Sequence, residues 1–76
     1  MIQRGINWTQ IPAAQYPILQ KYKKTRRMWH KGNYHESIYT DGKFYYHKDP
    51  LHGKVEKYDQ KGKHIGVRFQ QERHIQ

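Results

Sequence analysis

The 76-residue sequence predicts a mainly β protein, with a small, highly twisted antiparallel sheet (a meander) and a short N-terminal helix or arm. Turn signals recur at 41–42, 49–50 and 59–62, and segments rich in aromatic and β-branched residues lie between them. Hydrophobic residues make up 34% of the chain and include seven Tyr, two Trp and two Phe, so the core must consist largely of rings. A chain of this length is expected to form one domain, residues 1–76. Its sheet should curl over that core, because strands twist.

The segment before the sheet carries the weakest structural signal. Within residues 13–24, Tyr16, Leu19 and Tyr22 fall at positions i, i+3 and i+6, which lie on one face of a helix. Pro17 is compatible with a helix only in the first turn. A short helix and an extended arm therefore both stay open for this segment.

Strand-like composition begins near Trp29. Four segments are expected to be strands: 35–40, 43–47, 54–58 and 64–69. The Asp41-Gly42 pair between the first two is a strong signal for a two-residue hairpin loop. In the last segment, the side chains expected on one face are those of Ile65, Val67 and Phe69.

Fifteen Lys and Arg against six Asp and Glu give the chain a net charge of +9. Such a charge favours a polyanionic partner: nucleic acid, an anionic membrane or an acidic protein. We expect no membrane partner for the isolated domain, because the sequence has no apolar run that could span a bilayer and no obvious basic amphipathic helix. The lack of cysteine excludes disulfides and thiolate metal sites. It suits a cytosolic site of action or a chain that unfolds and refolds in transit.

The basic run at 23–27 precedes Trp29 closely, and a basic run beside aromatic residues suits an RNA backbone with splayed bases. The alternative is a solvated charged face. The residues that we expect to contact RNA are Lys23, Lys24, Arg26, Arg27, Trp29, Lys48, Lys54, Tyr58, His64 and Arg68.

Asp49, His52 and Glu56 supply the side-chain types that metal-free RNA cleavage needs. RNA carries its own nucleophile, the 2′-hydroxyl, so an enzyme must remove that proton, protonate the leaving 5′-oxygen and stabilise the phosphorane. Histidine suits a proton transfer because its pKa is about 6.5, and a second carboxylate can orient the imidazole. The alternative interpretation is structural, with a turn at Asp49 and a cross-strand partner for a lysine at Glu56.

A catalytic role for this set requires a bend in the backbone near Gly53. Four residues of straight strand would separate His52 from Glu56 by about 13 Å, which is too far for both to flank one phosphate. Gly53 permits a positive φ or a bulge, and either would shorten this distance.

The region from Asp49 resembles a known family. It reads DPLHGKVEKY at 49–58 and GKHIG at 62–66. This is similar to the cytotoxic domain of the ribosome-inactivating colicins and cloacin, with its Asp-x-x-His-Gly-x-hydrophobic-Glu-x-Tyr, a short turn, and Asp-Gly-x-His-hydrophobic-Gly. The closing Arg73-His74-Ile75 resembles the family's C-terminal Arg-Asn-Ile.

By position, the resemblance implies a role for each residue of the set. Glu56 would be the general base, His52 the general acid and Asp49 the residue that orients His52. Arg73 would stabilise the phosphorane, with Arg68 as the alternative. The resemblance implies no metal and no cofactor.

The resemblance also implies a biological role. The chain would be a secreted or delivered toxin domain that acts in the target-cell cytoplasm, as a metal-independent endoribonuclease on 16S ribosomal RNA at the decoding centre of the ribosome. An acidic immunity protein would protect the producer. Contact-dependent inhibition toxins carry similar domains as C-terminal payloads, so the delivery system stays open.

This sequence departs from the family pattern in several places. The turn at 59–62 is one residue shorter, Lys54 stands where the colicins have a glutamate, and the tail before Arg73 is shorter. Two other classes therefore stay open. One is a non-catalytic RNA-binding β-domain, and the other is a metal nuclease that uses the histidines His47, His52 and His64.

Overall fold

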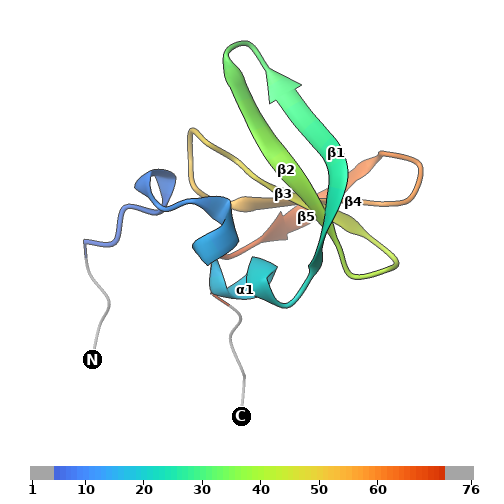
Figure 1. Cartoon of the computed structure of the whole chain (residues 1–76), viewed down its shortest axis with the longest axis horizontal. Helices are drawn as coiled ribbons and strands as arrows, with labels where there is room; N and C mark the ends of the chain where they lie inside the picture. The colour runs from blue at the N-terminus through green and yellow to red at the C-terminus, as the bar shows by residue number, and fades with distance from the viewer. Residues whose placement is uncertain (1–4, 72–76) are drawn as a thin grey trace.

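The structure, a computed structural model, describes residues 5–71. Five strands lie in the sheet in chain order, each antiparallel to the next, so the predicted meander is confirmed. They are β1 (Lys23–Lys31), β2 (Tyr34–Thr40), β3 (Tyr45–Lys48), β4 (Val55–Tyr58) and β5 (His64–Arg68). Before them come the 3-10 turns η1 (Trp8–Gln10) and η2 (Ala13–Gln15) and the helix α1 (Pro17–Gln20). Figure 1 shows the long β1–β2 hairpin projecting from the twisted sheet, with α1 near the opposite end of that hairpin.

Helix α1 is shorter than the segment that the sequence left open. Pro17 occupies its first turn, as expected, and the helix ends at Gln20. Strand β1 then begins at Lys23, inside the basic run that the sequence did not identify as a strand. Within the basic run, Lys23 and Lys24 pair with Thr40 and Tyr39 of β2, and the register then shifts before pairing resumes at Met28. Within residues 5–71, no helix is long and apolar enough to cross a membrane.

Asp41 closes the connection between β2 and β3 with its side chain. Its Oδ1 accepts hydrogen bonds from the backbone N–H groups of Lys43 (2.9 Å) and Phe44 (2.7 Å), and its Oδ2 accepts one from the Tyr46 hydroxyl (2.7 Å). The connection spans 41–44, and is therefore longer than the two-residue loop that the sequence predicts. The reason is that Asp41 forms a local turn with its own carboxylate.

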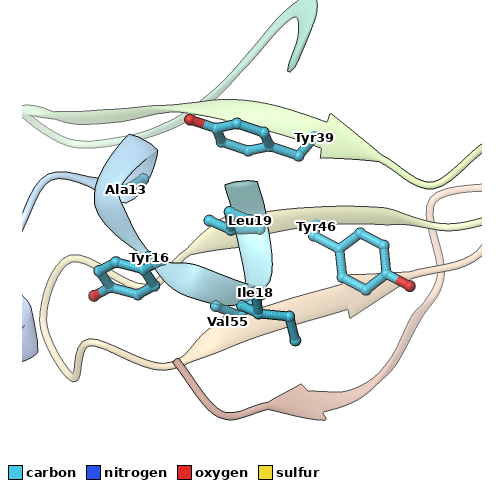
Figure 2. Close-up of a cluster of buried hydrophobic side chains, with 7 residues drawn as sticks. All are labelled: Ala13, Tyr16, Ile18, Leu19, Tyr39, Tyr46 and Val55. Atoms are coloured by element: carbon cyan, nitrogen blue, oxygen red, sulfur yellow. The ribbon is translucent and has the colours of Figure 1, made fainter. Parts of the chain in front are cut away.

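The core lies between the helical segment and one face of the sheet, as Figure 2 shows. Its buried hydrophobic side chains are those of Ala13, Tyr16, Ile18, Leu19, Tyr39, Tyr46 and Val55. Tyr22 adds a further ring, which stacks on Tyr46 with 4.5 Å between centroids. The core is rich in rings, as the composition predicted, and each such pair contributes about 0.5–1.5 kcal/mol beyond its buried area.

The edge strand β5 interrupts the predicted alternation. Lys57 lies opposite Gly66 whereas Tyr58 lies opposite His64, so Ile65 is an extra residue, a β-bulge. Because directly opposed residues share a face, the bulge places His64 on the face of Tyr58. The strand adds little to the core, since its large hydrophobic side chains, those of Ile65 and Val67, are exposed. Phe69, directly after the strand, is exposed as well.

Candidate active site

The loop between β3 and β4 holds Asp49 and His52 together. The Asp49 Oδ2 atom lies 2.9 Å from His52 Nδ1, and Oδ1 accepts hydrogen bonds from the backbone N–H groups of Leu51 (2.9 Å) and His52 (3.3 Å). Partial burial raises the pKa of Asp49, but these hydrogen bonds outweigh burial, and the pKa lies below its ordinary value. Asp49 is therefore ionised at neutral pH and orients the His52 ring, whose side chain is 68% exposed.

The backbone bends at Gly53, as predicted. Its φ is +77°, in the left-handed region that favours glycine. A Cβ at this position would lie 2.9 Å from the Cβ of Trp8, so any side chain would also collide with η1. The Tyr16 hydroxyl lies 2.9 Å from the Gly53 carbonyl oxygen and 2.7 Å from that of Trp8. The N-terminal segment is thus part of the support for the loop that carries His52.

Glu56 pairs with a histidine that the sequence interpretation had assigned to RNA contact. Its Oε1 atom lies 2.5 Å from Nε2 of His64, on the neighbouring strand. The Glu56 side chain is 19% exposed and that of His64 is 49% exposed. The bulge at Ile65 makes this contact possible, because it places His64 on the face of Glu56 and Tyr58. No sequence signal marks such a bulge, so the pairing was missed.

Three rings, which we call the ring stack, lie beside these pairs: Trp29 of β1, His47 of β3 and Tyr58 of β4. Their centroids are 4.3 Å apart for Trp29 and His47 and 5.2 Å apart for His47 and Tyr58, with interplanar angles of 19° and 22°. His47 Nδ1 lies 2.9 Å from the carbonyl oxygen of Lys48, which can only accept, so Nδ1 donates. The Nε2 atom of His47 then accepts a hydrogen bond from the Tyr58 hydroxyl at 2.9 Å.

Burial keeps both titratable members of the ring stack, His47 and Tyr58, neutral. It lowers the pKa of His47 and raises the pKa of Tyr58, and the negative charges of Glu56 and Asp49 raise the pKa of Tyr58 further. At neutral pH, His47 is therefore an uncharged ring with both nitrogens hydrogen-bonded.

A pocket of about 210 Å³ brings the predicted catalytic side chains together. It is lined by Asp49, His52 and Glu56, and the ring stack forms a further part of its wall. Lys31 and Tyr34, at the tip of the β1–β2 hairpin, also line it. The sequence interpretation did not assign Lys31 to the site, because this lysine lies outside the basic run and only the sheet order brings it here.

Lys48 is not placed to bind RNA, contrary to our prediction. It is only 5% exposed, and its amine donates hydrogen bonds to the carbonyl oxygens of Thr9 (3.0 Å) and Ile11 (2.8 Å). The alternation of β3 places Lys48 on the opposite face from His47, toward the N-terminal segment. Its charge therefore ties that segment to the sheet.

The alternative for the active-site arginine is also not placed at the pocket. Arg68 is half-buried opposite Val55, on the core face, whereas Glu56 lies opposite Val67. Arg68 is not among the residues that line the pocket. Arg73, our first choice for this role, lies outside the described residues.

No feature of the structure tests the other predicted RNA contacts, which therefore stay predictions. Among them are five exposed cations along β1 and in the β3–β4 loop: Lys23, Lys24, Arg26, Arg27 and Lys54. Trp29 and Tyr58 belong to the ring stack, whose faces are suited to bases.

The three histidines of the metal-nuclease alternative do not converge. His47 bonds to Tyr58 and a backbone carbonyl, His52 to Asp49, and His64 to Glu56. In the described part of the chain, no group of three or more His, Asp or Glu side chains is arranged to hold a metal ion.

Comparisons of the chain with protein-family models, curated proteins and solved structures found no match. The resemblance to the colicin cytotoxic domains therefore depends on the motif residues themselves.

Proposed function

We propose that this protein is a metal-independent endoribonuclease that cleaves RNA by attack of its own 2′-hydroxyl. One observation carries the proposal: Asp49, His52 and Glu56 line a single pocket, where a carboxylate–imidazole pair and a second carboxylate are available to one phosphodiester. The net charge of +9 supports a polyanionic substrate.

In the proposed reaction, Glu56 removes the proton of the 2′-hydroxyl, and the 2′-oxygen attacks phosphorus. The bond from phosphorus to the 5′-oxygen breaks, and His52 gives this leaving oxygen a proton. The products are a 2′,3′-cyclic phosphate and a 5′-hydroxyl. Asp49 accepts from Nδ1 of His52, which leaves Nε2 to carry the transferred proton.

Charge on the phosphorane must be stabilised as it develops. Lys31 supplies a positive charge at the pocket, and by resemblance Arg73 supplies a second. His64 lies against Glu56 and stabilises the base in its working position, in the way that Asp49 does for His52.

We further propose that the substrate is 16S ribosomal RNA at the decoding centre, that the chain is a delivered toxin domain acting in the target-cell cytoplasm, and that an acidic immunity protein binds it. These proposals depend on the motif at 49–66 and on the charge of the chain. Association with an acidic protein should slow steeply as salt is added, because salt screens electrostatic steering.

The second candidate is a non-catalytic RNA-binding domain, which the exposed cations of β1 and the ring stack would serve equally well. To separate the two, the purified domain is incubated with RNA in EDTA and the product ends are identified. Cleavage that leaves a 2′,3′-cyclic phosphate and is lost in His52→Ala supports the enzyme. A 3′-hydroxyl product, or no cleavage of RNA or ribosomes, overturns it. Primer extension on treated ribosomes then locates the cut.

A further inference from the structure

A second pocket, of about 200 Å³, lies on the same face of the sheet as the active-site pocket. The two pockets share the ring stack, since Trp29, His47 and Tyr58 line both. The catalytic loop belongs only to the first pocket, and the β4–β5 turn belongs only to the second. A ligand in the second pocket would therefore lie next to a phosphate held in the first.

The wall of the second pocket is suited to a flat, aromatic ligand. Besides the ring stack, Tyr45 and Ile38 line it, so most of its surface is ring or hydrocarbon. Polar side chains at this pocket come from Arg27, Asp59 and Gln60. The Arg27 guanidinium carbon lies 5.8 Å from the centroid of the Tyr45 ring, a geometry typical of cation–π contact.

The size of this pocket fits one planar ring system. An engineered protein cavity of about 150 Å³ holds benzene, so a pocket of about 200 Å³ has room for one nucleobase. Bases of single-stranded RNA are recognised by stacking on aromatic side chains and arginine planes, with hydrogen bonds to their edges. At this pocket, aromatic rings and Arg27 supply the stacking surfaces, and the Gln60 amide can form hydrogen bonds with the edge of a base.

We propose that the second pocket is a base subsite, which binds a splayed nucleobase of the RNA beside the phosphodiester to be cut. This inference depends on the proposed function for its substrate class and adds to it a specific contact. The pocket would act mainly on substrate binding, because the residues that line it alone, Ile38 and Tyr45 among them, do not line the pocket of the acid–base groups.

Ile38→Phe tests the subsite, because a ring at this position would fill the pocket. Ile6→Phe is the matched control: it makes the same change at an exposed residue that lines neither pocket. The probe is a short single-stranded 2′-O-methyl RNA, which cannot be cut because its nucleophile is blocked. A ribose-phosphate chain of equal length without bases controls for charge, and all measurements use one salt concentration.

We expect Ile38→Phe to weaken binding of the 2′-O-methyl RNA about tenfold, the size expected when one stacked base is lost. Binding of the base-free chain should be the same as in the wild type, and Ile6→Phe should match the wild type on both probes. On cleavable RNA, Ile38→Phe should raise KM with little effect on kcat. Thermal melts check that each variant folds, and Tyr45→Leu, which removes a ring from the wall, replaces Ile38→Phe if that variant does not.

Equal binding of the RNA by the Ile38 and Ile6 variants overturns the base subsite. So does an equal loss of affinity for the base-free chain, which would mean that the change acts through charge or folding. The binding assay does not need cleavage. If the wild type cuts no RNA but Ile38→Phe still loses base-dependent binding, the subsite stands and the proposed enzyme does not.

Discussion

Glu56 lies opposite His47 in the β3–β4 ladder, yet its carboxylate bonds to His64 of the next strand. Both ring nitrogens of His47 are used elsewhere, by the Lys48 carbonyl and the Tyr58 hydroxyl. The two histidines on either side of this carboxylate therefore have different roles: His64 is its hydrogen-bond partner, and His47 is a neutral member of the ring stack.

The first prediction is that Glu56 and His64 act as one unit. We expect Glu56→Gln to lower kcat at least about 100-fold, as for other acid–base groups. His64→Gln should cost about 10- to 100-fold, as the loss of an orienting partner usually does. The double variant should be no slower than Glu56→Gln, because residues that act together are not additive. Single-turnover rates on RNA measure this, with His30→Gln, outside the pocket, as control. Losses that multiply would show that the two residues act separately.

The second prediction concerns the orientation of His52. Asp49→Asn keeps an oxygen that can accept from the backbone N–H groups but removes the charge that faces His52 Nδ1. We expect kcat to fall about 10- to 100-fold, with KM nearly unchanged, because a positioning residue acts on the proton transfer. Steady-state kinetics on a short RNA give both constants. A rise in KM at constant kcat would contradict this role.

The meander was predictable because its signals are local. Asp41-Gly42 and the turn at 59–62 each lie between strand-like segments, and both fall within connections between strands, although the connection at Asp41 is longer than predicted. Strand β1 was not predictable in the same way, since the basic run at its start has no β-like composition, and its partners in β2, Thr40 opposite Lys23 and Tyr39 opposite Lys24, lie far along the chain. Tertiary pairing overrides a weak local preference.

The candidate site was predictable where residues lie close in sequence. Asp49 and His52 share one turn, and the bend at Gly53 followed from the distance that a phosphate imposes. Lys31 and His64 were missed as pocket and pair residues, because a hairpin tip and a bulge bring them in from other strands. Register at that level has no signature in the sequence alone.

The third prediction separates a structural lysine from one that contacts RNA. Lys48→Met leaves the carbonyl oxygens of Thr9 and Ile11 without their buried donor, so we expect unfolding free energy to fall by about 1–3 kcal/mol. The salt dependence of RNA binding should not change. Lys54→Met, at an exposed position, should leave stability unchanged. It should make the negative slope of log K against log salt less steep by about 0.7, as for one lost phosphate contact. Urea unfolding and salt titrations measure both, and the reverse pattern would refute the assignment.

The fourth prediction tests the contact between the bend and η1. Gly53→Ala forces a side chain into the left-handed region, at a cost of about 1–3 kcal/mol, and also places Cβ against Trp8. Gly42→Ala is the matched control, because its φ is +96° but no atom lies within 4 Å of the added Cβ. We expect Gly53→Ala to be the more destabilising of the two in thermal melts, and to lower RNA cleavage as well. Equal losses would mean that the Trp8 contact relaxes without cost.

The fifth prediction is that His47 makes the fold sensitive to mild acid. Burial lowers its folded pKa below the value of about 6.5 that it has in an unfolded chain. Above that pH the ring is neutral in both states, and its contribution to stability is fully present. As pH falls below 6.5, the unfolded chain gains a proton that the folded state does not bind, so stability is lost until the pH reaches the folded pKa.

His47→Phe tests this, because phenylalanine keeps a ring in the stack but cannot titrate. Urea unfolding at about pH 7.5 and pH 5 should show a larger loss of stability for the wild type than for His47→Phe, by about 1.4 kcal/mol for each unit of pKa shift that the interval covers. This window lies above the range in which Asp49 and Asp41 take up protons, since the pKa of each is lowered. NMR titration of the six histidines should also show one ring, absent from His47→Phe, that titrates below the ordinary range. Equal pH dependence of the two proteins would mean that folding does not lower the pKa of His47, so that its ring takes up a proton in the folded state as readily as in the unfolded chain. The hydrogen bond in which its Nε2 accepts from Tyr58 would then be wrong.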